Sequence, residues 1–236
     1  ADRIPGTERH LINLQYSNTD FWGQDVVAQI YYRDESLAFY PFPTLANGRV
    51  TSIGASQQKT DFYGGKLTIN SKPLDALTLT WGIDAEHENF DANQQFFNLN
   101  SAAASGGMQL DKAFKVERYP GYSITNIAPF LQSSYDIDAI TLSGGVRYQY
   151  MENRIDDFVG YTQQQAVASG KATSADAVPG GKTDYNNLLF NAGILGHVTD
   201  RQQLWFNFSQ GFEIPDPAKY YGAGTYQLVD GHYRLL

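Results

Sequence analysis

The fold class follows from one segment, Gln203-Leu-Trp-Phe-Asn-Phe-Ser-Gln-Gly-Phe-Glu-Ile-Pro-Asp-Pro217. Side chains alternate within it: Leu204, Phe206 and Phe208 face one side, and Trp205, Asn207 and Ser209 face the other. A period of two, with large apolar residues on one face and small polar ones on the other, is typical of a strand with lipid outside and water inside. The prolines at 215 and 217 then end the ladder, because proline lacks a backbone N–H.

Alternation of this kind recurs along the chain. Together with 204–209 it predicts eight strands, the others being 10–16, 26–33, 63–70, 77–86, 124–135, 140–150 and 188–198. Short links follow the first, third, fifth and seventh strands. Long connections follow the second, fourth, sixth and eighth, at about 34–59, 89–122, 153–184 and 213–236. Membrane barrels have this alternation of link length, whereas nothing in a soluble sandwich requires it.

Composition excludes several classes. The net charge is −8 with no basic stripe, which disfavours a nucleic-acid partner. No cysteine is present, so disulfides and thiolate metal sites are excluded. The chain has no apolar run of about 20 residues, so a transmembrane helix is not expected.

The size of the barrel is inferred from its inward side chains. Eight strands are enough to close a small barrel with a packed interior. The predicted inward residues are bulky and charged, however, which favours a wide hydrated lumen; they are Arg33, Lys66, Asp84, Glu86, Arg147 and His197. We therefore predict that residues 1–236 are part of a single β-barrel domain, eight consecutive strands of a larger barrel whose remaining strands lie outside this sequence.

Two loop segments carry a resemblance to a known family. They are Phe39-Tyr-Pro-Phe-Pro43 and Ser209-Gln-Gly-Phe-Glu-Ile-Pro215 with the following Lys219-Tyr-Tyr-Gly222. Further matches lie at Ala55-Ser-Gln-Gln58 and in strand segments such as Gly145-Val-Arg-Tyr-Gln-Tyr150. Together they resemble TonB-dependent outer-membrane receptors, and the match runs through most of the chain.

The resemblance implies an all-β fold, a transmembrane antiparallel barrel of about 22 strands filled by a plug domain. It also implies import of a ferric siderophore in the outer membrane of a Gram-negative bacterium. The implied cargo is of the citrate–hydroxamate type to which ferric aerobactin belongs. Iron would arrive already coordinated, so no intrinsic cofactor and no protein ligands to iron are expected. The implied partners are outer-membrane lipid, the TonB complex through a plug that this sequence lacks, and phages or bacteriocins.

An anionic chelate requires cationic groups and aromatic walls at the mouth of the lumen. The candidate substrate-binding residues are Phe39, Tyr40, Phe42, Arg118, Tyr119, Arg147, Tyr185, Lys219, Tyr220 and Tyr221. Each also has a structural interpretation. Arg147 and Arg33 would pair with carboxylates, loop lysines would be solvated, and tyrosines near strand ends would form an interfacial girdle. For the Phe39–Phe42 cluster, ligand contact and packing within the loops remain alternatives.

Other functions are weighed against this one. A receptor for another siderophore and a passive porin would share the architecture. An enzyme is disfavoured, because the sequence has no G-x-S-x-G or H-E-x-x-H motif and a strand would place His87 opposite its neighbours Glu86 and Glu88. A divalent-metal site at Asp156-Asp157 is a weak alternative, because adjacent loop acids are usually solvated.

Overall fold

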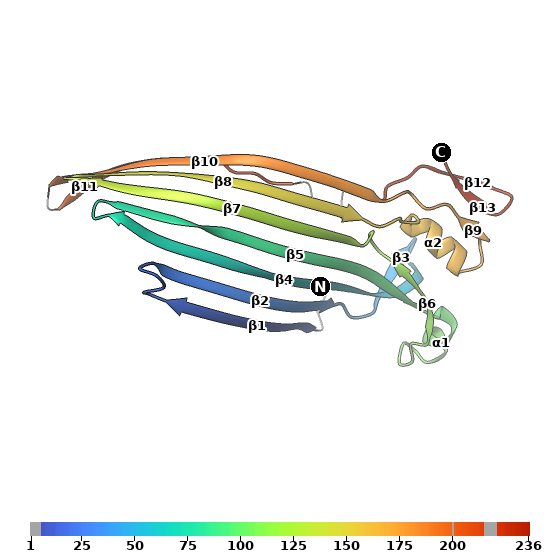
Figure 1. Ribbon diagram of the computed structural model, residues 1–236. Helices are drawn as coiled ribbons and strands as arrows, with labels where there is room; N and C mark the ends of the chain where they lie inside the picture. Colours follow the sequence, from blue (N-terminus) through green and yellow to red (C-terminus); the bar gives the residue numbers. More distant parts are fainter. Residues whose placement is uncertain (1–5, 200, 215–220) are drawn as a thin grey trace.

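The computed structural model describes residues 6–199, 201–214 and 221–236. Its main feature is a long antiparallel sheet in which eight strands follow one another in chain order (Figure 1). These strands are β1 (Gly6–Asn18), β2 (Asp25–Ala38), β4 (Arg49–Leu74), β5 (Leu77–Phe97), β7 (Tyr122–Ile137), β8 (Ile140–Ile155), β10 (Gly181–Thr199) and β11 (Gln202–Ser209). All eight predicted strands are confirmed, and so is the all-β antiparallel fold class.

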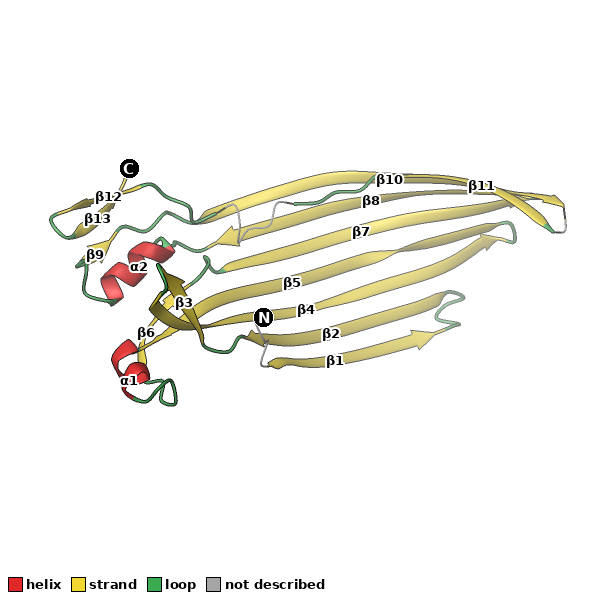
Figure 2. Ribbon diagram, turned by 180° about the vertical axis from the view of Figure 1, so that it is seen from behind, coloured by secondary structure: helices red, strands yellow, loops and turns green. Residues whose placement is uncertain are grey.

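The remaining elements gather at one end of the sheet, which we call the loop end (Figure 2). Two short strands extend the sheet there: β3 (Phe42–Ala46) pairs with β4, and β6 (Lys112–Glu117) pairs with β5. A separate three-stranded sheet has the order β12–β13–β9. The strands of this sheet are β9 (Ser174–Ala175), β12 (Tyr226–Val229) and β13 (His232–Leu235). Two short helices lie at the same end, α1 (Leu99–Ala104) and α2 (Tyr161–Ala168).

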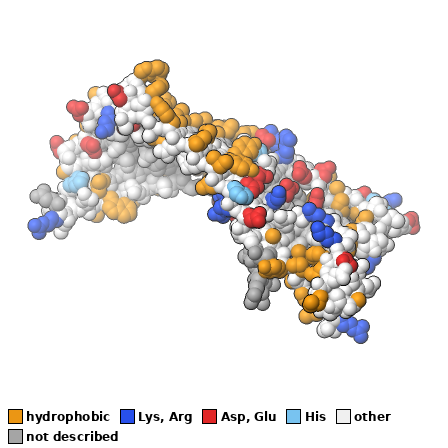
Figure 3. All heavy atoms as spheres, turned by 90° about the horizontal axis from the view of Figure 1, so that it is seen from below, with side chains coloured by type: hydrophobic (Ala, Val, Ile, Leu, Met, Phe, Trp, Pro, Cys, Tyr) orange, Lys and Arg blue, Asp and Glu red, His pale blue; other side chains and the backbone are white. Residues whose placement is uncertain are grey.

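The two faces of the long sheet differ in chemistry, as the alternation predicts. Leu67 on β4 lies opposite Ile83 on β5, and this apolar face exposes many large hydrophobic side chains (Figure 3). The neighbouring pair, Lys66 and Asp84, belongs to the other face, which we call the polar face. In a membrane the apolar face meets lipid and the polar face lines the lumen.

Charges on the polar face are paired with one another. The guanidinium Nη2 of Arg147 lies 2.7 Å from Asp84 Oδ2. Tyr31 donates a hydrogen bond of 2.7 Å to Glu86, whose carboxylate also lies 4.0 Å from Lys66 Nζ. These contacts cross several strands, so they bind the wall together on its wet side.

Close approach of strands requires glycine at one position in particular. A Cβ added at Gly82 on β5 would lie 1.8 Å from the carbonyl oxygen of Leu67. Real Cβ atoms never come so near to backbone, so only glycine allows β4 and β5 to approach at this point.

The long connections hold more regular structure than their polar composition indicates. β4 has 26 residues and β5 has 21, so both run far beyond the predicted strands 63–70 and 77–86. The predicted connections at 34–59, 89–122 and 153–184 therefore contain strand and helix segments as well as turns. The predicted strands ended where the alternation of apolar and polar residues ends. The backbone hydrogen bonds between β4 and β5 continue beyond that point towards the loop end, because they do not require apolar side chains.

At the other end of the sheet, which we call the turn end, the links are tight. Trp22 and Gly23 between β1 and β2, and Asp138 between β7 and β8, have φ values of 54°, 77° and 49°. No helix among the described residues has the length and apolar character needed to cross a membrane.

Candidate functional site

The polar face continues into the loop end through Ser56 on β4 and Gln94 on β5. These two residues are cross-strand partners, and the β4–β5 register runs without a shift from them down to Lys66 and Asp84. Because side chains alternate with a period of two, Ser56 and Gln94 lie on the same face as Lys66 and Asp84. Both are covered, with exposed fractions of 2% and 6%.

Arg118 covers Ser56. It follows β6 directly, its backbone N–H donates to the carbonyl oxygen of Ala92 at 2.9 Å, and its guanidinium Nη1 donates to Ser56 Oγ. The guanidinium carbon also lies 5.6 Å from the ring centroid of Tyr119. Among the described residues no carboxylate lies within 4.0 Å of Arg118. Its charge is therefore not neutralised by a direct ion pair with any of them.

The predicted aromatic cluster Phe39–Phe42 begins next to Ser56. Phe39 donates its backbone N–H to the carbonyl oxygen of Ser56 at 2.9 Å. Tyr40 and Phe42 beyond it have exposed fractions of 55% and 37%, and Phe42 lies opposite Gly54 at the start of β3. The structure thus brings Phe39, Arg118 and Tyr119 together around Ser56, with exposed aromatic rings next in the chain.

Helix α2 contacts Gln94, the cross-strand partner of Ser56. Tyr161, its first residue, donates to Gln94 Oε1, and burial raises the pKa of the Tyr161 phenol. Gln164 of α2 accepts from the backbone N–H of Glu117 at 2.9 Å, at the edge of β6. Tyr161 was not among the predicted residues, and neither were Ser56 and Gln94. Of these three residues, only Ser56 lies in a segment that matched the receptor family, Ala55–Gln58.

A second aromatic group lies further along the polar face. Tyr185 on β10 is hydrogen-bonded to Tyr221, and its ring centroid lies 6.0 Å from that of Phe212. The structure therefore joins the predicted residues Tyr185 and Tyr221. Lys219 and Tyr220 fall outside the described residues.

Arg147 does not belong to either group. It lies in the middle of β8, paired with Asp84 and 5.8 Å from the ring centroid of Phe130. This is the structural pairing that the sequence offered as the alternative for Arg147. Its contacts make it part of the wall rather than of the mouth.

The group around Ser56 has the chemistry to bind an anion. It offers one guanidinium, neutral amide and hydroxyl groups, and aromatic rings. No cluster of three or more His, Asp or Glu residues suited to a metal ion occurs within the described ranges. Contact with a chelate that brings its own metal remains a prediction for every residue of this group.

Comparison with known proteins places the chain in a family. The model of the TonB dependent receptor-like β-barrel matches residues 2–233. The chain is 63% identical to the ferric aerobactin receptor of Klebsiella pneumoniae and 59% identical to that of Escherichia coli. It is 42% identical to the rhizobactin receptor of Rhizobium meliloti (strain 1021). Each alignment covers 100% of this chain and 32% of the relative, so the chain spans about a third of these receptors.

Solved structures agree on the fold. The copper transporter OprC superposes with a TM-score of 0.68 at 14% identity, over 92% of this chain and 32% of that one. The unliganded ferric citrate transporter FecA gives a TM-score of 0.59 at 16% identity, over 85% of this chain and 27% of that one. At these identities the likeness shows the barrel architecture alone. From its family match and its relatives, the chain belongs to the TonB-dependent receptor β-barrels of the Gram-negative outer membrane.

Proposed function

We propose that the receptor containing this chain binds ferric aerobactin and imports it across the outer membrane by TonB-coupled transport. The observation that carries the proposal is the high identity, 63% and 59% over the whole chain, to two proteins named ferric aerobactin receptor. The plug and the TonB contact belong to the proposed whole receptor, because this chain covers 32% of those relatives.

The group around Ser56 supports the proposal chemically. A citrate–hydroxamate chelate is anionic on a partly apolar body, so it needs a cation beside aromatic surface. Arg118 has no direct carboxylate partner among the described residues, stacks on Tyr119 and is held by Ser56 on the lumen face. Iron would arrive already coordinated, so the protein is required to supply neither a ligand to iron nor a catalytic group. We infer a receptor without enzymatic chemistry.

A receptor for a related siderophore is the second candidate, since the rhizobactin receptor is 42% identical over the whole chain. A passive porin is less consistent with the family match over residues 2–233. Binding of phages or bacteriocins to the exposed loops stays a prediction.

Iron-limited growth separates these functions. The complete receptor is expressed in a Gram-negative strain without its own siderophore receptors, in the presence and absence of TonB. We expect growth on ferric aerobactin that requires TonB, and no growth on a ferric trihydroxamate. Growth on both chelates without TonB would indicate a porin. Growth on neither would rule out a hydroxamate cargo.

A further inference from the structure

The side-chain amide of Gln94 is engaged at one end and open at the other. Its Oε1 accepts a hydrogen bond from Tyr161, whereas its Nε2 donates no hydrogen bond to any described residue. We propose that Gln94 is a specificity-determining residue, which donates from Nε2 to an oxygen of the same chelate carboxylate that Arg118 binds. This inference rests on the proposed function and names a further contact of its site.

The hydrogen bond from Tyr161 orients the amide. A Gln amide has an acceptor end and a donor end, and the hydrogen bonds around it determine which way they point. Burial raises the pKa of Tyr161, which keeps the phenol protonated and able to donate to Oε1. With Oε1 engaged in this way, the two N–H groups of Nε2 face away from Tyr161 and are available to an acceptor.

The open end of the amide lies on the lumen face next to Gly54. A Cβ added at Gly54 would lie 2.5 Å from Gln94 Nε2, so the absence of a side chain there makes room for the amide. Gly54 lies two residues from Ser56 on β4, or about 7 Å along the same face. Ser56 holds the guanidinium group of Arg118, and Phe42 is the register partner of Gly54. Gln94 Nε2 therefore lies between the positions of a cation and an aromatic ring.

Nε2 also keeps contact with solvent. Among the described residues, the buried side-chain nitrogen and oxygen atoms without a hydrogen-bond partner are Arg33 Nε and Asn153 Oδ1. Gln94 Nε2 has no partner either but does not belong to this set, so it is not sealed off. The residue as a whole has an exposed fraction of only 6%. A ligand that reaches Nε2 would form its hydrogen bond in largely desolvated surroundings, where such a bond is stronger than in water.

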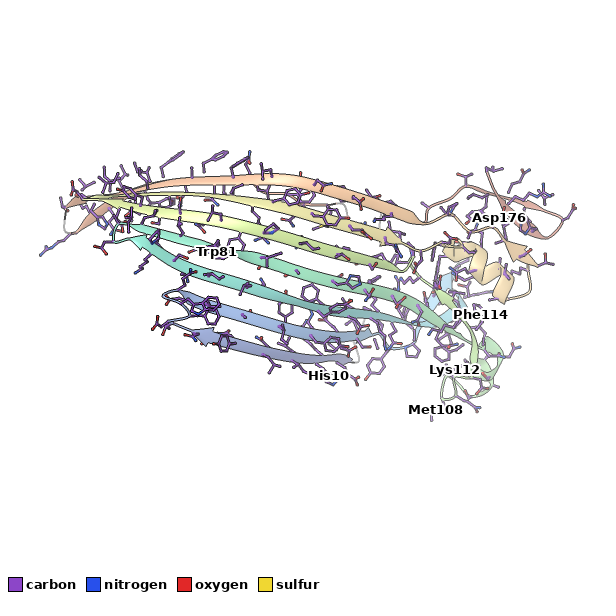
Figure 4. The ribbon with its side chains drawn as sticks, in the orientation of Figure 1. His10, Trp81, Met108, Lys112, Phe114 and Asp176 are labelled. Carbon is purple, nitrogen blue, oxygen red and sulfur yellow. The ribbon has the colours of Figure 1, made fainter. Side chains whose placement is uncertain are left out.

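The surroundings of Nε2 suit a carboxylate on a partly apolar body. Arg118 supplies the charge, because no carboxylate of the described residues lies within 4.0 Å of it. Phe96, the register partner of Gly54 on β5, stacks on Phe114 at the loop end with ring centroids 4.9 Å apart (Figure 4). A carboxylate offers two oxygens, so a guanidinium and a neutral amide can each donate to one of them. A chelate without a carboxylate gains nothing from this pair of donors.

Fluorescence titration of the complete receptor with ferric aerobactin tests the proposal, with a ferric trihydroxamate as the comparison chelate. Gln94→Met keeps the length of the side chain and adds no charge, but it has no N–H donor. Gln94→Glu keeps the acceptor for Tyr161 and replaces only the donor. A loss shared by both variants therefore reports the donor. Tyr161→Phe measures the effect of releasing α2 alone.

The matched control is Gln57→Met. It makes the same replacement on β4, but position 57 alternates with Ser56 and so lies on the opposite face of the sheet. Gln57 Nε2 donates to Ser36 Oγ at 3.0 Å, so this variant also loses one hydrogen bond. Melting temperatures of all variants show whether the fold is intact.

We expect Gln94→Met to bind ferric aerobactin about tenfold more weakly, because a hydrogen bond to a charged group is lost. Gln94→Glu should lose at least as much, since it places a negative charge beside the anion. Tyr161→Phe should lose only a few fold, and Gln57→Met should bind as the parent does. The preference of the receptor for ferric aerobactin over the trihydroxamate should fall with the affinity.

A loss in either Gln94 variant that is no larger than that of Tyr161→Phe would overturn the proposal, because Gln94 would then act only by holding α2. Equal losses in Gln94→Met and Gln57→Met would overturn it as well. If Gln94→Met does not fold, Gln94→Glu decides, since it retains the hydrogen bond from Tyr161. Failure of the parent to bind ferric aerobactin would instead contradict the proposed function itself.

Discussion

Ser56 and Gln94 are cross-strand partners on the lumen face, and each accepts a hydrogen bond from a different connection at the loop end. Arg118, which follows β6, donates to Ser56, and Tyr161 of α2 donates to Gln94. The two extended strands thereby hold the guanidinium, its aromatic neighbour and α2 in one place. Loss of either bond would free one of these parts while leaving the wall below unchanged.

Ser56→Ala should weaken the binding of ferric aerobactin only modestly. Arg118 keeps its charge and its contact with Tyr119 in this variant, but it loses the hydroxyl that positions it. We expect a loss of a few fold, about 1 kcal/mol, as for one hydrogen bond. Fluorescence titration of the complete receptor measures it. A loss as large as that of an Arg118 variant would assign Ser56 a direct contact with the ligand.

Arg147→Ala should destabilise the barrel without changing which siderophore binds. The substitution leaves Asp84 on the polar face without its 2.7 Å partner. We expect a loss of about 1–3 kcal/mol in the free energy of unfolding, measured by denaturant titration of the complete receptor. The double variant Asp84→Ala/Arg147→Ala serves as the control and should be less destabilised than the sum of the two single variants. Strict additivity would contradict a coupled pair.

Gly82→Ala should be destabilising because its Cβ would lie 1.8 Å from the carbonyl oxygen of Leu67. Strand movement to relieve such contacts costs about 1–3 kcal/mol. Gly144→Ala on β8 is the matched control, since its Cβ would lie 3.8 Å from the nearest atom, the carbonyl oxygen of Asn191. Thermal unfolding of both variants measures the difference. Equal melting temperatures would show that β4 and β5 have room at this position.

Asp176, which follows β9 closely, links this strand to β13 in the small sheet at the loop end. The strength of this link should depend on pH. Its carboxylate accepts from Leu235 N at 3.0 Å and lies 3.0 Å from His232 Nε2, while His232 Nδ1 is 2.7 Å from Ser174 Oγ. The backbone hydrogen bond from Leu235, with a smaller effect of His232, lowers the pKa of Asp176 from its ordinary 3.8. A lowered pKa stabilises the folded link above pH 3.8, and that stability is lost as pH falls through the lowered value.

Hydrogen exchange at the Leu235 amide measures this link. We expect Asp176→Asn to remove most of the protection at pH 7, and the parent to lose protection only at pH values below 3.8. Protection that stays the same in Asp176→Asn would mean that other contacts hold β13 against β9.

The eight strands were predictable because lipid on one side and water on the other impose a period of two on their side chains. The same reasoning placed Lys66, Asp84 and Arg147 on one face, and it offered the carboxylate pairing that Arg147 makes. The need of an anionic chelate for cations and aromatic walls added Phe39, Arg118 and Tyr119 as candidates, and the structure brings these three together.

The loop end was not predictable in the same way. In segments 49–62 and 88–97 apolar and polar residues no longer alternate regularly, and Val50 and Ile53, for example, would face opposite sides. Their pattern therefore does not show that the backbone ladder of β4 and β5 continues. Tyr161 meets Gln94 across 67 residues of sequence, and no local rule connects the two.

The most direct test of the account is a binding titration of the complete receptor with ferric aerobactin, comparing the parent with Arg118→Gln and with Lys112→Gln. Quenching of tryptophan fluorescence reports binding, and a ferric trihydroxamate serves as the comparison chelate. The account predicts tight and selective binding of ferric aerobactin by the parent and by Lys112→Gln, and binding weakened about 10–100-fold by Arg118→Gln, because a charge-assisted contact is removed. Tight ferric aerobactin binding that Arg118→Gln leaves unchanged would contradict the assignment of the Ser56 group as the chelate site.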